Sequence, residues 1–278
     1  MTESGLANAI LAARILVLAP HMDDETLGCG GTMLLHASKP DVHCLFATDG
    51  AASPAPLLPW LGRIDGGLAA ARRREALAAA ATIGVPAENL RFLDLPDGKL
   101  TARRQDLLRA LAEAVAAIEP EFVFAPFRYD VHPDHVALNR AARDVLRALP
   151  AAPALLEYFV YHRLPLAPRG DVRQALEPRA LLRIDTRSVA DAKRAALGCY
   201  LTQTTIRYPW QDRVVLTDES LRRRCAEPEL FVPTDPAAPL SAGFVSHSRQ
   251  IRFAGLATRL GKRRKDQAAA LVRWVLQR

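Results

Sequence analysis

The stretch "RILVLAPHMDDETLGCGGTM", Arg14 to Met33, passes from an apolar run to a polar turn and a glycine-rich segment. The apolar run Ile15–Ala19 predicts a strand, and Pro20 marks its end. A histidine and three acids follow within five positions: His21, Asp23, Asp24 and Glu25. Carboxylates so close together repel one another, and a bound cation relieves that repulsion. The stretch therefore predicts a cation site where a strand gives way to a helix.

Short β-type runs alternate with helix-forming stretches over the first 150 residues. Further strands are predicted at 42–50, 89–95 and 122–127, and helices at 68–84, 102–119 and 135–149. This alternation predicts an α/β protein, a Rossmann-like three-layer fold with a mainly parallel sheet. Ligands bind such sheets at the carboxyl ends of the strands, so these polar strand ends should converge on one rim: 21–25, 48–50, 94–98 and 128–135.

The alternation loosens after residue 150. One more strand is predicted at 155–164 and one more helix at 189–204. Residues 205–249 are predicted to be mostly loop, with a short strand at "ELFVP". The tail, 256–278, has the pattern of a basic amphipathic helix.

Composition favours a globular cytoplasmic protein. Half of the 278 residues are hydrophobic, yet no apolar run reaches the length of a membrane span. The N-terminus lacks a basic start and carries Arg14 inside its apolar stretch, which argues against a signal peptide. The cysteines at 29, 44, 199 and 225 are scattered without a CxxC pair, so we expect reduced core thiols.

A second polar cluster, "RYDVHPDHVALN", follows the strand predicted at 122–127, and it carries Asp130, His132, Asp134 and His135. Imidazole and carboxylate together suit zinc or another first-row divalent ion. A catalytic zinc needs three protein ligands and an open position for water. His21, one carboxylate of the first cluster and one histidine of the second supply such a set, and the remaining carboxylate can accept the water proton. The alternative is that these acids only cap helices; two clusters at matching strand ends disfavour it.

Two other classes of protein are less favoured. A dinucleotide-binding dehydrogenase needs G-x-G-x-x-G directly after the first strand, whereas here the glycines lie behind acids that would repel a pyrophosphate. Gly28, Gly30 and Gly31 are expected instead to allow close helix packing. A nucleic-acid-binding protein has only the net charge of +7 and the dense "GKRRK" at 261–265 in its favour.

These motifs resemble those of the PIG-L/LmbE-type zinc-dependent N-deacetylases. The family's A/P-H-P-D-D-E motif and glycine-rich helix are similar to "PHMDDETLGCGG", with Met22 where proline is usual, and H-P-D-H matches residues 132–135 without departure. Supporting similarity lies in "RRREALAAAATIGV", "LDLPDG", "LLEYFVYHRL" and "KRAALGCYLTQ". The resemblance implies a deacetylase core over residues 1–204 and a C-terminal extension, 205–278, packed on the same domain.

The resemblance assigns roles to the two motifs. It implies that His21, Asp24 and His135 are the metal ligands, with zinc as the cofactor and Fe²⁺ or Co²⁺ as alternatives. Asp23 matches the general base. His132, expected to be protonated, matches the histidine that stabilises the oxyanion or protonates the leaving amine.

Substrate contacts carry over less directly. Arg72 matches the arginine that holds the sugar, and Asp97 matches an acid that contacts substrate hydroxyls. Asp130 is our own addition, because its position suggests that it orients His132.

The implied reaction removes an N-acetyl group from an amino sugar or an N-acetylglucosamine conjugate, releasing acetate and a free amine. An amidase of the same family acting on a longer N-acyl chain or a thiol conjugate is the alternative. The partner is thus a small molecule, and no nucleic acid is expected. Weak contact of the basic tail with a membrane surface and assembly into a homo-oligomer are left open.

Overall fold

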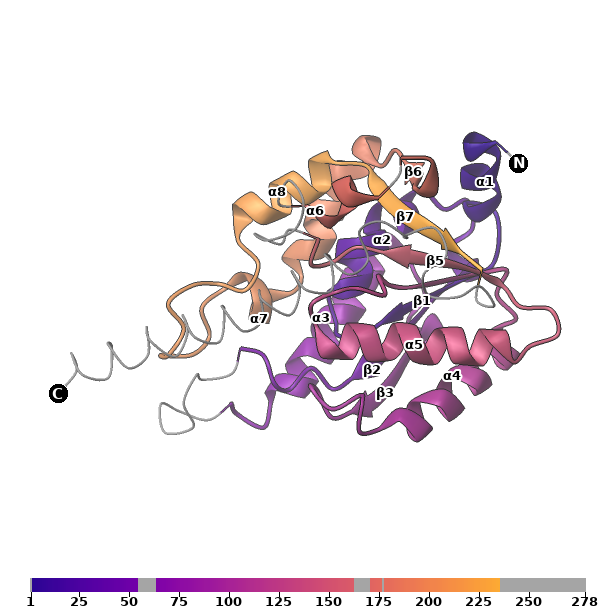
Figure 1. The fold of residues 1–278 in the computed structure, drawn as a ribbon. Helices are drawn as coiled ribbons and strands as arrows, with labels where there is room; N and C mark the ends of the chain where they lie inside the picture. Colours follow the sequence, from indigo (N-terminus) through magenta and orange to yellow (C-terminus); the bar gives the residue numbers. More distant parts are fainter. Residues whose placement is uncertain (1, 55–63, 163–170, 177, 236–278) are drawn as a thin grey trace.

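The computed structural model describes residues 2–54, 64–162, 171–176 and 178–235. The helix predicted for the tail 256–278 therefore lies outside the described residues. The sheet has seven strands in the order β3-β2-β1-β4-β5-β7-β6 (Figure 1). They span Ile15–Ala19 (β1), Val42–Thr48 (β2), Leu90–Leu95 (β3), Phe122–Pro126 (β4), Ala154–Tyr158 (β5), Leu182–Ile184 (β6) and Glu229–Thr234 (β7).

The helices flank this sheet. They span Glu3–Ile10 (α1), Asp24–Leu35 (α2), Leu68–Ile83 (α3), Arg104–Ile118 (α4), Pro133–Arg147 (α5), Ala190–Gly198 (α6), Leu201–Thr204 (α7) and Asp218–Ala226 (α8). β1 to β5 pair in parallel, and β7 runs antiparallel to both β5 and β6. The predicted mainly parallel α/β sheet is confirmed.

Residues of β1 alternate between two cores. Ile15, Val17 and Ala19 pack in a cluster that includes residues of α2, α3 and α6, while Leu16 and Leu18 pack in a second cluster with α4 and α5. Successive strand side chains point to opposite faces, so both faces of the central strand are covered. The described chain is therefore a three-layer sandwich, with β1 in the middle of its five parallel strands.

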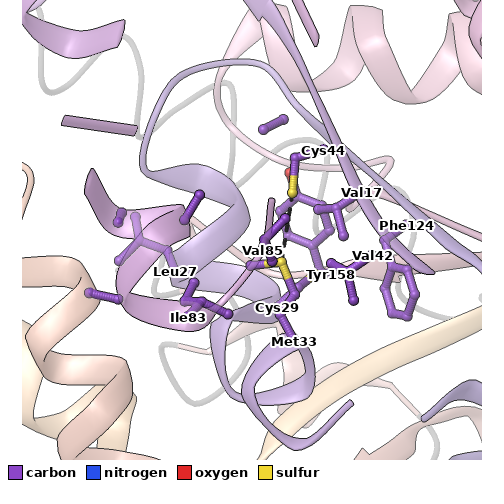
Figure 2. Packing of buried hydrophobic residues seen from close by; sticks show 14 of the residues in the cluster. Val17, Leu27, Cys29, Met33, Val42, Cys44, Ile83, Val85, Phe124 and Tyr158 are labelled. Carbon is purple, nitrogen blue, oxygen red and sulfur yellow. Dashed lines mark hydrogen bonds between the residues drawn. The ribbon is translucent and has the colours of Figure 1, made fainter. Parts of the chain in front are cut away.

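Helix α2 packs unusually closely on the sheet, and Figure 2 shows its residues Leu27, Cys29 and Met33 within that packing. A Cβ on Gly28 would lie 2.2 Å from the Tyr158 ring, and one on Gly31 would lie 2.4 Å from Cβ of Thr186. No real Cβ tolerates such distances. The prediction of close helix packing is confirmed for Gly28 and Gly31, whereas a Cβ on Gly30 would come no closer than 3.1 Å to a side chain.

Several boundaries follow local chemistry. Gly84 is the C-cap of α3 with a φ of 94°, a left-handed conformation that glycine adopts without strain. α5 begins at Pro133, two residues earlier than predicted, because His132 is its N-cap and proline suits the first helical position. The helix predicted over 189–204 is divided into α6 and α7 at Cys199–Tyr200.

The prediction of mostly loop after residue 204 is wrong for α8. Thr217 caps this helix by accepting a hydrogen bond from the Ser220 backbone N–H at 3.2 Å. Only Leu221 and Cys225 of the helix are buried, so its apolar stripe is too narrow to show a clear period. The strand predicted at "ELFVP" is confirmed as β7, which lies between β5 and β6 in the same sheet.

Within the described ranges, no helix has both the length and the apolar character needed to cross a bilayer.

Candidate active site

The polar clusters converge at the carboxyl ends of the parallel strands. His21 to Asp24 follow β1, Asp97 follows β3, and His132 follows β4 at the start of α5. These side chains line a cavity of about 160 Å³. The polar strand ends therefore meet at one cavity, as the sequence predicted.

The Asp24 carboxylate lies between two histidines. Its Oδ2 is 3.1 Å from Nδ1 of His21 and 3.2 Å from Nε2 of His135. Ligand atoms held tetrahedrally by zinc lie roughly 3.3 to 3.6 Å apart. Both ring nitrogens of the fully buried His135 lack an aligned hydrogen bond. A buried donor set at metal-ligand spacing, with orphaned imidazole nitrogens, fits a divalent cation.

The carboxylates of the site favour positive charge on the neighbouring histidines. Burial by itself lowers the pKa of His135, but the Asp24 and Asp130 carboxylates raise it to about 9. The pKa of His21 is also raised despite burial, through its contacts with Asp134, Asp24 and Asp97. Burial favours the neutral form of Asp24, yet the two histidines hold its pKa well below the usual range. A divalent ion can replace the protons that this negative field attracts.

A second carboxylate faces the other ring nitrogen of His21 and of His135. Oδ1 of Asp97 is 3.0 Å from Nε2 of His21, and its Oδ2 accepts a hydrogen bond from the Ala52 backbone N–H at 2.9 Å. Oδ2 of Asp130 is 3.3 Å from Nδ1 of His135. Such carboxylate–histidine pairs fix ring orientation and strengthen the ligand.

Two sequence-based roles look different in this geometry. Asp97, expected to contact substrate hydroxyls, lies against His21 at the cavity wall. Asp130, expected to orient His132, accepts a hydrogen bond from the backbone N–H of His132 at 2.8 Å. Its other oxygen faces the ring of His135.

Asp23 has an unusual backbone and an unusual carboxyl group. Its φ of 133° is strained for a residue other than glycine, and its side chain makes no capping hydrogen bond to α2. Burial raises its pKa to about 7, with the Asp24 and Glu25 charges adding to the effect and Arg72 opposing it. Helix capping thus does not explain Asp23, whereas a general base needs a pKa near the working pH.

Glu25 is a site residue that sequence analysis did not assign. Its Oε2 accepts a hydrogen bond from the Asp23 backbone N–H at 3.1 Å. Its Oε1 accepts from the hydroxyls of Thr26 and Tyr200. Glu25 therefore fixes the strained turn that presents Asp23. Both residues belong to motifs that the sequence analysis quoted. Glu25 is the last acid of the first motif, and Tyr200 is the tyrosine of "KRAALGCYLTQ".

Arg72, expected to hold the sugar, is almost fully buried beneath the turn. Its Nη2 donates to the Met22 carbonyl at 2.6 Å, and its Nη1 donates to the Gly50 carbonyl at 3.3 Å. Nη2 also lies 3.4 Å from Oδ1 of Asp23. Arg72 lines the cavity, but its visible contacts position the turn and the carboxylate of Asp23.

The surroundings of His132 favour a different protonation state from the one that we expected. Its Nδ1 accepts a hydrogen bond from the Asp134 backbone N–H at 3.3 Å, which leaves the proton of the neutral ring on Nε2. Burial, with the neighbouring His21 and His135, lowers its pKa to about 4. These surroundings favour the neutral ring of His132, with Nε2–H as a hydrogen-bond donor, over the protonated ring that we expected.

Other ligand combinations are also close in space. Nitrogens of His21, His132 and His135 lie within 4.8 Å of one another, and so do donor atoms of His21, Asp97 and Asp134. His21 belongs to both groups, which makes it the common centre of the site.

Residues from later in the chain than the two motifs also line the cavity. They are Val160, Tyr161, Gln203, Val215, Leu216 and Arg224. The last three lie in the region after residue 204, where the sequence offered no template.

Comparison with known proteins agrees with the fold. Residues 16–146 match the family model "PIG-L: GlcNAc-PI de-N-acetylase". A conserved protein from Thermus thermophilus is 26% identical, with 83% of this chain and 98% of that chain covered and a TM-score of 0.56. No curated protein matches the chain.

Two further solved structures share the architecture at lower identity. The N,N'-diacetylchitobiose deacetylase of Pyrococcus horikoshii is 21% identical, covering 82% of this chain and 88% of its own, with a TM-score of 0.57. A 4-carboxy-2-hydroxymuconate hydratase of Pseudomonas putida is 19% identical, covering 82% and 98%, with a TM-score of 0.54. At these identities the likeness concerns the fold alone.

Proposed function

We propose that this protein, whose residues 16–146 match the PIG-L family model, is a metal-dependent N-deacetylase acting on an amino sugar or an N-acetylglucosamine conjugate. One observation carries the proposal most strongly. A strained, buried Asp23 with a pKa near 7 adjoins the ligand set of His21, Asp24 and His135. Hydrolysis of an amide needs this combination of a base and an electrophilic centre.

When bound at this site, a divalent ion supplies Lewis acidity and lowers the pKa of water. Asp23 accepts the proton of the attacking water as the acetamide carbon becomes tetrahedral. The Nε2–H of His132 donates to the oxygen on which negative charge develops. The C–N bond then breaks, the proton held by Asp23 passes to the amine, and the products are acetate and a free amine.

The fold by itself does not choose this reaction, because a hydratase shares it. The family match favours amide hydrolysis, and the chitobiose deacetylase supports an N-acetylated sugar as the substrate class. The His/Asp donor set favours zinc, with Fe²⁺ or Co²⁺ as alternatives. The free cysteines, three of them buried, favour a cytoplasmic setting.

The test is a direct assay on protein loaded with one equivalent of Zn²⁺. Acetate and free amine should appear in equal amounts from N-acetylglucosamine, its glycosides and N-acetylated disaccharides, and EDTA should stop the reaction. N-octanoyl and cysteine-linked analogues tell deacetylation from action on longer acyl chains or thiol conjugates. Zinc-loaded protein that releases no amine from any of these amides would rule out the proposal.

A further inference from the structure

Arg224 lines the active-site cavity from α8, well outside the segment matched by the family model. Its Nη2 donates a hydrogen bond to the Val160 carbonyl at 2.5 Å. This bond anchors the guanidinium against the chain segment that follows β5. Arg224 is thus a fixed feature of the cavity wall rather than a mobile surface arginine.

Val160, which accepts this hydrogen bond, lies next in the chain to a residue that is close to His132 and His135. Tyr161 follows Val160, and its ring centroid is 5.4 Å from that of His135 and 6.3 Å from that of His132. Tyr161 and Arg224 line the same cavity. A substrate that reaches the histidines therefore comes within range of the guanidinium.

Nearby arginines are paired, and Arg224 is not. Arg173 lies 2.8 Å from a carboxylate oxygen of Asp171 and 2.9 Å from one of Glu227. In the described part of the chain, no carboxylate lies within ion-pair distance of Arg224, and its hydrogen bond is to a neutral carbonyl. Burial also lowers its pKa, which shows that the charge has lost water. A guanidinium has five N–H donors, so most of its capacity is unused.

The charges that line the cavity come from different parts of the chain. Its acids, Asp23, Asp24 and Asp97, follow β1 and β3, where the acetamide would react. Its lining residues after residue 200 are Gln203 of α7, Val215, Leu216 and Arg224 of α8, and none of them is an acid. A substituent of the substrate that reaches these later residues would meet a positive charge and no carboxylate.

We propose that Arg224 is a specificity-determining residue that binds an anionic group, a carboxylate or phosphate, carried by the N-acetylated substrate. The proposal rests on the proposed deacetylase function and narrows its substrate class. Arginine suits this task because its planar fork matches both anions with two parallel hydrogen bonds. Val215 and Leu216 supply apolar contact on the same wall.

The experiment compares three substrates on zinc-loaded protein: N-acetylglucosamine, N-acetylglucosamine 1-phosphate and N-acetylmuramic acid. The two anionic sugars separate phosphate from carboxylate. We expect kcat/KM for at least one of them to exceed that of the neutral sugar by about ten- to a hundredfold, since hydrogen bonds to charged groups are worth that much. Arg224→Met should remove most of this preference, largely through KM, and Arg224→Lys should restore part of it.

Arg223→Met is the matched control, because Arg223 is exposed on the same helix and does not line the cavity. It should keep the wild-type preference. Equal loss on anionic and neutral substrates in Arg224→Met, or no preference in the wild type, overturns the proposal. Thermal melting and zinc content show whether the variant is intact.

A binding measurement tests the anion site at Arg224 independently of the proposed deacetylase function. Calorimetry should show that glucosamine 1-phosphate or muramic acid binds at least tenfold more tightly than glucosamine, and that Arg224→Met abolishes the difference. If no amide is hydrolysed yet this pattern holds, the deacetylase function fails and the anion site stands. If hydrolysis occurs without the pattern, only the anion site fails.

Discussion

Two clusters of buried charge in this protein are built in opposite ways. Glu229 of β7 accepts four hydrogen bonds of 2.6 to 2.8 Å, from the Lys193 ammonium, the Gly31 and Thr32 backbone N–H groups and the Thr32 hydroxyl. The active-site cluster gathers several acids, holds Asp23 at a φ of 133° and leaves both ring nitrogens of His135 without aligned partners. A fully satisfied cluster stabilises the fold, whereas a frustrated one is kept for a ligand.

The largest effect should come from removing a metal ligand. His21→Ala and His135→Ala should lose stoichiometric zinc and activity, because each removes one of the three proposed ligands from a buried set. His132→Ala should keep zinc if His132 is a catalytic donor and lose it if the three histidines form the ligand set. Metal analysis after dialysis decides this, with His43→Ala in β2 as the control. Full zinc in both of the first variants would show that the site is wrong.

Replacing the strained acid should separate function from stability. Asp23→Asn should keep zinc and reduce kcat by about a hundred- to ten-thousandfold, as expected for loss of a general base. Asp94→Asn is the control, since Asp94 is also an aspartate with positive φ but lies exposed beside Arg73. A rate close to wild type in Asp23→Asn would exclude the assigned role.

A substitution in the Glu229 cluster should change the stability of the protein rather than its activity. Glu229→Ala should lower the free energy of unfolding by about 3 to 5 kcal/mol, because it leaves Lys193 buried without its partner. Glu219→Ala, at an exposed position of α8, should change it by no more than about 0.5 kcal/mol. Urea denaturation measures both. If Glu229→Ala unfolds at the same urea concentration as wild type, the pairing of Glu229 with Lys193 does not stabilise the fold.

The pH dependence should follow Asp23. Its pKa is raised from 3.8 to about 7, so kcat/KM should fall about tenfold per pH unit on the acid side of a midpoint at or below about pH 7. In the metal-free protein the native state binds this proton more tightly than the unfolded chain does. The stability it contributes is therefore full below pH 3.8 and is lost as pH rises toward 7. Unfolding in EDTA should show this decline for wild type but not for Asp23→Asn.

The smallest effect on turnover should come from the tail. Cavity-lining residues of the described chain end at Arg224, so truncation after Leu260 should leave hydrolysis of a soluble N-acetyl sugar unchanged. If the basic tail contacts membranes, truncation should also abolish binding to anionic vesicles at low salt. A truncated protein that is folded and zinc-loaded but inactive would place the tail in the active site.

Local patterns in the sequence predicted most of the fold and the centre of the site. The continuous apolar run at 15–19 marks a strand buried on both faces, and the acids or histidines after each strand mark one edge of a parallel sheet. Hence His21, a carboxylate of the first motif and a histidine of the second could be assigned to one site from the sequence alone. The sequence could predict this because the carboxyl ends of parallel strands all lie at one edge of the sheet. Residues that directly follow different strands are therefore brought together.

Tertiary structure decided what surrounds those residues. The contact of Tyr200 with Glu25 joins positions 175 residues apart, and the anchor of Arg224 on Val160 depends on how α8 packs, which it does against α6. The neutral state of His132 and the raised pKa of Asp23 depend on burial and on charges brought together by folding. No periodicity records such contacts, because hydrogen bonding and desolvation depend on distance in space, whereas sequence patterns record only the order and spacing of residues along the chain.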